Sequence, residues 1–358
     1  MKIAIMECGC HANVAGYPSF LQNKIMNKIY TEQAKISLII PTRKRVEMLQ
    51  NLLDSLREHK WLMRDDVEVL VVDNASDKST ARDLCSCYNS VKYLYVAEPG
   101  QRNALNYGIR KASGELLAFV DDDVVVISED WLYRMAKHFS EHSNLGYVSG
   151  NVKALETASR AQEIWEKGGG LSKGQTSVYW SNKEVVNNYR WRPLPLARIC
   201  VGANSMIPRS VFRKVGLFIP LFDPGAPIPH GGSLEMGYRI IKAGYDLFYD
   251  SEAIVLHHHP TTESELQKKL FIYGVGDTAI QAYFFWRYRD YRGIWWALGG
   301  YQFYRIYSYV MGQYNFPFLY VFWQMIGGCY GTFLLFFRLA YKDSAKFFKI
   351  PLLSEIQD

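Results

Sequence analysis

Three consecutive aspartates, Asp121, Asp122 and Asp123, directly follow the apolar run Leu116–Val120 in this chain of 358 residues. A buried strand that ends here would bring three carboxylates into one small volume, where burial and mutual repulsion disfavour their charged forms. A divalent ion such as Mg2+ or Mn2+ relieves that repulsion, and it often shares its oxygen ligands with a substrate diphosphate. The triplet could instead form an acidic, solvated turn in which an aspartate caps the next helix.

The elements before the aspartates alternate between apolar strands and amphipathic helices. We predict strands at Ile36–Ile40, Val67–Val72, Val91–Val96 and Leu116–Val120, with helices between them at Glu47–Arg57, Thr80–Tyr88 and Asn103–Ala112. Continuous apolar strands separated by helices indicate an α/β fold with a mostly parallel sheet that is covered on both faces. In such sheets, ligands bind outside the carboxyl ends of the strands.

Polar residues follow the first two predicted strands at that same edge. The first strand is followed by Pro41, Thr42 and Arg43, and the second by Asp73. A dinucleotide fold would carry a Gly-x-Gly-x-x-Gly turn after its first strand, and this chain has no glycine there. The sheet therefore favours a nucleotide-binding site without a nicotinamide or flavin cofactor.

Further motifs come later in the chain, at Gly100 with Arg102-Asn103, at Gly202-Ala203-Asn204, and at His257. Together with the aspartates and the strand ends, their order and spacing resemble a family 2 glycosyltransferase of the GT-A fold. The matching stretch runs from about residue 37 to residue 259, which is well over half of the chain. Each motif is short, so the specificity of the match lies in their order.

The resemblance implies a role for each matching residue. The donor nucleotide sugar would be bound by residues at the strand ends and at the start of the third predicted helix: Pro41, Thr42, Arg43, Asp73, Gly100, Arg102, Asn103, Asp121 and Asp122. The acceptor side would be lined by Gly202, Ala203 and Asn204. The ion, Mn2+ or Mg2+, would be held by Asp123 as the direct ligand, by Asp121 and by His257. The nucleotide base would meet Asp73, which in this family commonly goes with uridine; Asp73 and Asn204 could instead be local turn or cap residues.

The catalytic base is the point at which the sequence departs from the family's pattern. Counting back from Arg239, the family's usual Glu-Asp pair falls on Gly232 and Ser233. A serine cannot take the place of a carboxylate that removes a proton from an acceptor hydroxyl. We expect Glu235 to be the base, with Asp223 as a second candidate. Weak, altered or lost activity stays open, as does a simple helix N-terminal charge at Glu235.

A run of three histidines, His257, His258 and His259, raises the question of a zinc site. Consecutive residues on a strand point to alternate faces, so at most two of the three rings share a side. A dedicated three-histidine zinc site is therefore not expected. Either His257 alone supplements the aspartate-held ion, or the histidines are hydrogen-bonded structural residues.

The last part of the chain, after about residue 270, differs in kind. Residues 306–337 contain no Asp, Glu, Lys or Arg, and Phe316–Phe337 is long enough to cross a bilayer, for which about 20 apolar residues suffice. Upstream, tryptophans and tyrosines mix with arginines, as in interfacial segments. We expect a membrane-associating helical region that lies on or in the membrane, with a single span and a buried helical hairpin as alternatives.

Composition adds few restrictions. The hydrophobic content of 49% allows a large core, and the net charge of +6 gives no argument for a nucleic acid partner. The six cysteines form no C-x-x-C pair and indicate free thiols. Residues 1–34 lack the apolar core of a secretory signal and are interpreted as an extension. We divide the rest into a catalytic domain, 35–262, with nucleotide-binding (35–128) and acceptor-binding (129–262) halves, and a helical region, 263–358.

The leading hypothesis is a metal-dependent, inverting glycosyltransferase at the cytoplasmic face of the membrane. Its donor would be a UDP-sugar, and its acceptor a glycan or a polyprenyl-linked glycan in polysaccharide biosynthesis. One alternative is a nucleotidyltransferase, although the stretch 41–45 lacks the glycines of a phosphate loop. Another is a weakly active or inactive nucleotide-binding scaffold subunit, which the serine at position 233 favours.

Overall fold

The computed structural model describes residues 35–74, 78–313, 315–334 and 349–353. The predicted N-terminal extension, 1–34, lies outside the described residues. In the first half, every predicted strand and helix is confirmed to within a few residues. The order is β1 (Ile36–Thr42), α2 (Val46–Glu58), the 3-10 turn η1 (Trp61–Met63), β2 (Val67–Asn74), α3 (Lys78–Ser86), β3 (Val91–Val96), α4 (Gln101–Lys111) and β4 (Leu116–Val120).

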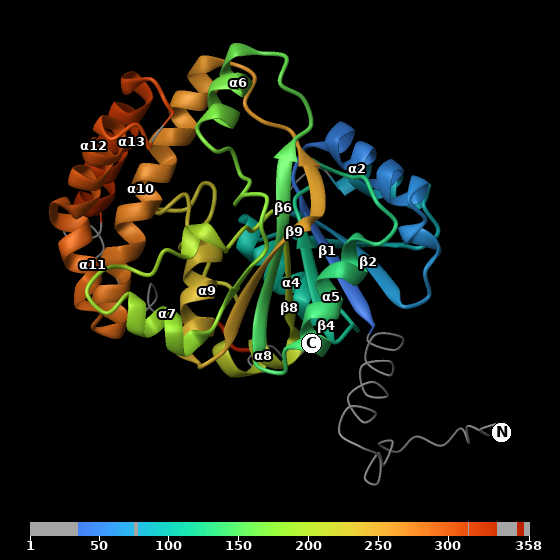
Figure 1. The fold of residues 1–358 in the computed structure, drawn as a ribbon. Coiled ribbons are helices and arrows are strands. Elements are labelled where there is room, and N and C mark those ends of the chain that lie inside the picture. Colours follow the sequence, from blue (N-terminus) through green and yellow to red (C-terminus); the bar gives the residue numbers. More distant parts are fainter. Residues whose placement is uncertain (1–34, 75–77, 314, 335–348, 354–358) are drawn as a thin grey trace, which may run out of the picture.

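One twisted sheet runs through the described residues, with the strand order β3-β2-β1-β4-β8-β6-β9-β5 and β7 paired to β9. The four strands β3, β2, β1 and β4 are parallel, as predicted, and β8 is antiparallel to β4. Helices cover both faces (Figure 1), which confirms the predicted α/β class. Because the carboxyl ends of the parallel strands share one edge, the polar residues after β1, β2 and β4 are brought together there.

The second half has more elements than the sequence indicated. They are β5 (Val124–Val126), α5 (Trp131–Glu141), β6 (Leu145–Ala154), α6 (Arg160–Lys167), β7 (Val178–Trp180), α7 (Asn182–Asn188), η2 (Leu196–Arg198), β8 (Asn204–Pro208), α8 (Arg209–Val215), α9 (Gly232–Lys242) and β9 (Asp246–His257). β9 is one continuous strand of 12 residues. It bulges after Asp250, so that Gly150 pairs with Asp250 but Asn151 pairs with Ile254.

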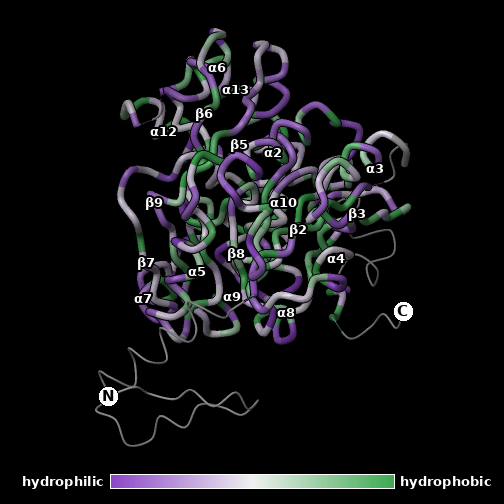
Figure 2. Tube along the Cα trace, turned by 90° about the vertical axis from the view of Figure 1, so that its right-hand side faces the viewer, coloured by the Kyte–Doolittle hydropathy of each residue, from purple (hydrophilic) through white to green (hydrophobic). Residues whose placement is uncertain are grey.

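Two hydrophobic cores lie on opposite faces of the sheet. In β1, Leu38 and Ile40 face the core that α2, α3 and α5 cover, whereas Ile39 faces the core shared with α4, α8 and α9. This alternation follows the two-residue period of a strand. Apolar residues gather in the strands at the middle of the molecule (Figure 2). The side chains of Leu38, Ile39 and Ile40 are fully buried. Packing on both faces of the sheet therefore fixes the position of the strand ends.

The C-terminal region begins with the long helix α10 (Glu263–Tyr288) and continues through α11 (Tyr291–Trp295), the π-helical segment η3 (Trp296–Gly300), α12 (Tyr301–Val310) and α13 (Phe318–Phe333). Helix α10 starts at a capping box formed by Thr262 and Glu265. Its residues Ile280 and Tyr283 belong to the same core as α4 and α9. The helices thus form a layer beside the catalytic half (Figure 1), with α10 directly against it.

Glycines allow α13 to approach α10 closely. A side-chain carbon at Gly327 would collide with the carbonyl oxygen of Phe271, and one at Gly274 would collide with that of Gln324. The Thr278 hydroxyl donates a hydrogen bond of 2.8 Å to the Gly328 carbonyl across this contact. Small residues that bring two helix backbones together are a familiar means of tight helix packing.

No helix within the described ranges is both long and apolar enough to cross a membrane. Helix α13 has 16 residues, whereas a span needs about 20. The predicted segment Phe316–Phe337 extends past residue 334 into the part of the chain that the structure does not describe.

A buried carboxylate ties three neighbouring strands together. Glu68 on β2 accepts hydrogen bonds from Ser37 on β1 (2.6 Å), from Lys92 on β3 (2.6 Å) and from the backbone N–H of Ser113 (2.8 Å). Burial alone would raise the pKa of Glu68, but the hydrogen bonds from Lys92, Ser37 and Ser113 lower it from 4.5 to about 2. The charged form is therefore the one that stabilises the sheet.

We predict that Glu68→Gln lowers the free energy of unfolding at pH 7 by about 1–3 kcal/mol, because the amide removes the negative charge and replaces one of the two acceptor oxygens with an NH2 donor. The pKa of Glu68 is lower in the folded state, so its stabilisation is complete above pH 4.5 and is lost as the pH falls toward 2. Urea unfolding of both proteins across this range measures the difference. The exposed Glu115→Gln is the control, and a difference that does not change with pH would contradict the prediction.

Candidate active site

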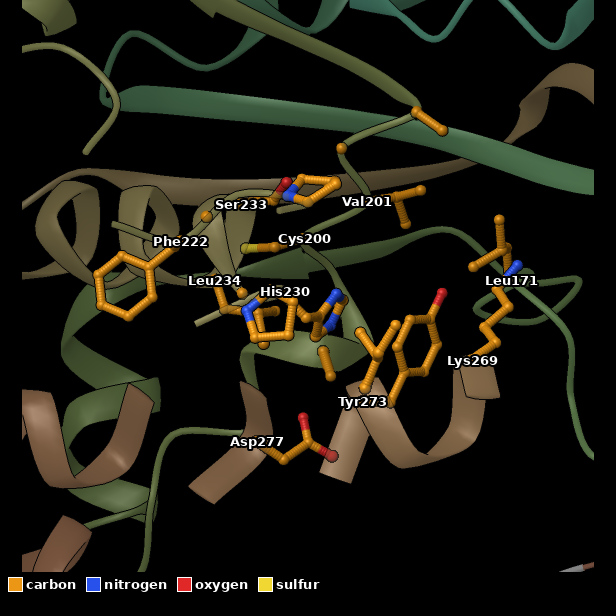
Figure 3. Close-up of a pocket in the computed structure, with 18 of the residues that line it drawn as sticks. Leu171, Cys200, Val201, Phe222, His230, Ser233, Leu234, Lys269, Tyr273 and Asp277 are labelled. Carbon is orange, nitrogen blue, oxygen red and sulfur yellow. The ribbon is translucent and has the colours of Figure 1, made fainter. Parts of the chain in front are cut away.

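A cavity of about 770 Å3 opens at the carboxyl edge of the sheet (Figure 3). Asp121 and Asp123 line it on the sheet side, together with His257 from the end of β9. A second wall is the loop that leads into α9, and a third is formed by α10 and α13. The C-terminal helices that the sequence assigned to a membrane region are therefore part of the cavity wall.

Strand pairing brings His257 to the aspartates. β5 runs antiparallel to β9, and Val124 lies opposite His257, so the imidazole stands beside Asp123. The His257 Nε2 atom is 3.2 Å from Asp123 Oδ1. One ligand atom from each of Asp121, Asp123 and His257 can be chosen so that all three lie within 4.8 Å of one another. The predicted metal-ligand set is thus a cluster in space.

The charges in this cluster suit a cation. Burial and the neighbouring carboxylates raise the pKa of Asp121 to about 7. Burial would also raise the pKa of Asp123, but His257 and Arg45 outweigh it and hold that pKa below its usual value. Burial lowers the pKa of His257 to about 4, so its imidazole is neutral and able to ligate a metal. The buried Oδ1 of Asp123 accepts no hydrogen bond from the described residues. Two carboxylates and a neutral imidazole fit Mn2+ or Mg2+.

Asp122, predicted to bind the donor, points away from the cavity. It is fully buried, accepts a hydrogen bond of 2.8 Å from Thr42 and lies 2.5 Å from the Arg45 guanidinium. Arg45 also contacts Asp123 at 2.7 Å. Arg43, the predicted donor contact, is exposed and does not line the cavity. The cationic run at 43–45 indicated that a basic side chain would lie near the aspartates. The directions of the side chains just before α2 decide that Arg45, and not Arg43, reaches them.

The remaining predicted donor residues divide between the cavity and its support. Arg102 at the start of α4 lines the cavity. Gly100 before it has a φ of +128°, a backbone conformation that favours glycine, and its N–H donates to Asn74. Asn103 instead donates to the Pro99 carbonyl at 2.9 Å, outside the cavity. Asp73 is buried and accepts a hydrogen bond from the Tyr93 hydroxyl at 2.8 Å.

On the predicted acceptor side, Gly202 and Ala203 line the cavity, whereas Asn204 does not. Asn204 is fully buried, accepts a hydrogen bond of 2.9 Å from the Trp131 indole, and donates one of 2.9 Å to the Ala253 carbonyl. It therefore joins β8 to α5 and β9 as a structural residue, through long-range contacts and not as the local turn or cap residue of the alternative interpretation.

The three histidines follow the alternation of a strand. The rings of His257 and His259 stack with their centroids 5.2 Å apart, and His259 contacts Glu166 at 3.0 Å. His258 is joined to the aspartates by its backbone N–H, which donates to the Asp123 carbonyl. Within the described residues, His257 is the histidine of this run that belongs to the candidate metal cluster.

Glu235, the predicted base, is fully buried and does not line the cavity. Its carboxylate pairs with the Arg239 guanidinium one turn later at 2.7 Å. Arg239 in turn donates to the carbonyl oxygens of Val215 and Leu217. Glu235 therefore anchors α9 to the end of α8, because its position on the helix faces inward. The residues of α9 that line the cavity are those of its first turn, Gly232, Ser233 and Leu234.

Asp223, the second candidate for the base, is also turned away from the cavity. It is buried and accepts a hydrogen bond of 3.1 Å from the backbone N–H of Arg102, at the start of α4. Burial raises its pKa to about 6. Its contacts are those of a helix N-terminal cap.

Sequence reasoning missed several residues of the cavity. Tyr273 and Lys269 come from α10, and His230 from the loop before α9. The His230 ring stacks on Tyr273 with centroids 4.3 Å apart, and the Lys269 ammonium lies 4.6 Å from the Trp165 ring centre. The signal was present as Lys269, Tyr273 and Asp277 at four-residue spacing, which places them on one face of a helix.

The chain is similar to known glycosyltransferases. The family model described as glycosyl transferase family 2 matches residues 37–216, half of the chain. Glycosyltransferase AglE of Haloferax volcanii is 27% identical over 68% of this chain and 73% of its own length. A GalNAc(5)-diNAcBac-PP-undecaprenol beta-1,3-glucosyltransferase of Campylobacter jejuni is 30% identical over 37% of this chain and 43% of its own length. The structure of mannosyltransferase PcManGT from Pyrobaculum calidifontis in complex with GDP-Man and Mn2+ is 17% identical, with a TM-score of 0.49, over 72% of this chain and 71% of that one.

The chain therefore belongs to glycosyl transferase family 2, as the sequence motifs predicted. Its α/β sheet with helices on both faces is the GT-A arrangement expected for that family. It is a glycosyltransferase.

We predict that Glu235→Gln lowers the free energy of unfolding by about 3 kcal/mol or more, because it leaves the Arg239 guanidinium buried and uncompensated. Urea unfolding measures this loss, and the exposed Glu184→Gln on α7 is the control. A variant that is as stable as the wild type but has lost sugar transfer would contradict the structural role and return Glu235 to the position of base.

Proposed function

We propose that this enzyme is metal-dependent and inverting, and that it moves a sugar from a nucleotide-sugar donor to a glycan or polyprenyl-linked acceptor. The observation that carries the proposal is the cluster of Asp121, Asp123 and His257 at one end of a cavity large enough for a nucleotide sugar. The resemblance at Asp73 makes a UDP-sugar the first donor to test. The name of the Campylobacter relative supports an acceptor that is linked to a polyprenyl diphosphate.

The ion would be held by Asp121, Asp123 and His257. When bound, Mn2+ or Mg2+ would neutralise the negative charge that develops on a departing nucleoside diphosphate. Cationic side chains of the cavity would bind the same diphosphate: Arg102, Lys173 and Lys269. Burial lowers the pKa of Lys269 to about 8 even though Asp123 and Asp121 raise it. An anion beside it would favour its charged form further.

The aromatic residues of the cavity would hold the sugar. Trp165, Tyr273 and Phe316 all line it, and the Trp165 ring lies 5.7 Å from that of Tyr273. Rigid aromatic faces exclude water, while the few polar groups between them fix the orientation of a ligand. A cavity that excludes water also protects the donor from hydrolysis.

We further propose that the outer face of α12 and α13 contacts a membrane surface, from which a lipid-linked acceptor enters. Large apolar side chains are exposed along both helices: Phe303, Tyr304, Ile306, Tyr307 and Val310 on α12, and Phe318, Leu319, Phe322, Ile326, Tyr330 and Phe333 on α13. An apolar face of this extent is uncommon on a monomer that stays in water. Two exposed cations that precede it, Arg287 and Arg289, suit an anionic lipid surface.

A donor screen tests the enzymatic part of the proposal. We expect purified protein with Mn2+ to release nucleoside diphosphate from one member of a panel of UDP- and GDP-sugars when an undecaprenyl diphosphate-linked glycan is added. Removal of the metal with EDTA should abolish release, and added Mn2+ or Mg2+ should restore it. Turnover that is unchanged in EDTA would contradict the metal-dependent mechanism, and nucleotide binding without any turnover would favour the scaffold alternative.

Vesicle flotation tests the membrane part. We expect the wild type to float with vesicles that contain anionic phospholipids, and the double variant Phe303→Ser with Val310→Ser to lose at least about 90% of that binding, because each substitution removes exposed apolar area. Trp191→Ser, at an exposed tryptophan on a loop after α7, is the matched control. Equal flotation of the double variant and the wild type would contradict the proposal.

A further inference from the structure

The cavity lacks a carboxylate at the place where the family's pattern puts the base. Ser233 occupies that place and lines the cavity. Among the described residues, the carboxylates that line the cavity are Asp121, Asp123 and Asp277. The first two belong to the candidate metal cluster. Asp277 lies outside that cluster.

Asp277 lies on α10, on the C-terminal wall of the cavity, and Ser233 lies in the first turn of α9 on another wall. Figure 3 shows its carboxylate on the side of the cavity below His230, which lies in the loop before α9, and Leu234, which lies in the first turn of α9. The backbones are close at this point, because a side-chain carbon at Gly276 would lie only 2.7 Å from Cβ of His230. The glycine beside Asp277 thus allows α10 to bring the carboxylate close to the start of α9.

An ion pair with α12 holds the Asp277 carboxylate in place. The Arg305 guanidinium of α12 donates to its Oδ2 atom at 3.2 Å. The Asp277 side chain keeps about a quarter of its exposure, 23%, so that it can still contact a ligand in the cavity. This pair also lines a second cavity of about 360 Å3, together with Leu234 and Ala197. Asp277 therefore lies where the two cavities adjoin.

The spacing along α10 connects Asp277 to the donor end of the cavity. Tyr273 lies one helical turn earlier on the same face and lines the cavity with it. Burial raises the pKa of Tyr273 most, and the carboxylates of Asp277, Asp121 and Asp123 raise it further. The Tyr273 hydroxyl therefore interacts electrostatically with Asp277 and with the aspartates of the metal cluster. A sugar that rests against Tyr273 would have the aspartates of the metal cluster on one side and Asp277 on the other.

We propose that Asp277 is the general base of this enzyme and replaces the carboxylate that Ser233 has displaced; this inference rests on the proposed transferase function. Asp277 Oδ takes the proton of the acceptor hydroxyl as the acceptor oxygen bonds to the anomeric carbon. The bond from that carbon to the diphosphate oxygen breaks at the same time, and the nucleoside diphosphate leaves with the electron pair. Burial raises the pKa of Asp277 even though Arg305 and the Tyr301 hydroxyl oppose it, and a raised pKa makes a carboxylate a better base.

His230 and Asp223 are weaker candidates for the same role. Burial lowers the pKa of His230 to about 3, so its imidazole has little tendency to hold a proton. Asp223 does not line the cavity and is occupied at the start of α4. Asp277 is the carboxylate that combines access to the cavity with a position away from the metal cluster.

A rescue experiment tests the proposal. We expect Asp277→Asn to lower kcat by at least about 100-fold while the Kd for the nucleoside diphosphate with Mn2+ stays within about twofold, because a base acts on the chemical step. Adding Ser233→Asp, which returns a carboxylate to the family's usual place, should raise kcat of the Asp277→Asn protein at least about tenfold. Thermal unfolding of each variant shows whether the fold is retained.

The outcomes separate the two levels of inference. If the wild type transfers no sugar from any donor, the proposed function fails. If the wild type transfers sugar and Asp277→Asn transfers it equally well, Asp277 is not the base and the proposed function stands. A loss of activity that Ser233→Asp does not restore would mean that Asp277 only supports the cavity wall with Arg305, and it would overturn the proposal.

Discussion

The negative charges of the three carboxylates after β4 must be compensated, and the rest of the site depends on this constraint. Packing on both faces of the sheet fixes the end of that strand, so the three aspartates cannot move apart. Thr42 and Arg45 bind Asp122 from the β1 side, and His257 approaches Asp123 from β9. Asp121 and Asp123 are left facing the cavity. A divalent ion with a diphosphate would complete a balance of charge that the protein alone satisfies only in part.

The sequence predicted the nucleotide half of the fold well, because fully buried strands and amphipathic helices carry strong periodic signals. It also predicted that Asp121, Asp123 and His257 would come together, and the pairing of β5 with β9 does bring the imidazole to the aspartates. The site predictions that the structure contradicts depend on the direction in which a side chain points. Asp122 faces Thr42, Asn204 faces Trp131, and Glu235 faces Arg239. Adjacent or closely spaced residues of one motif point to different sides, and only the three-dimensional packing decides which of them reaches the cavity.

The C-terminal helices give the clearest example of information that a local pattern does not hold. Their aromatic composition indicates a membrane-associating surface, and the exposed face of α12 and α13 fits that interpretation. The opposite side of the same region packs into the catalytic core through α10 and supplies Lys269, Tyr273 and Asp277 to the cavity. Ser233, where the sequence departs from the family's pattern, and the carboxylate of Asp277 both line this cavity.

The most direct test of the central claim is the position of the ion. Anomalous diffraction from crystals grown with Mn2+ and a nucleoside diphosphate would locate it without reference to turnover. The account predicts one manganese peak among Asp121, Asp123 and His257, with a diphosphate oxygen among its ligands. Crystals that contain the nucleotide but show no manganese peak at these side chains would contradict it.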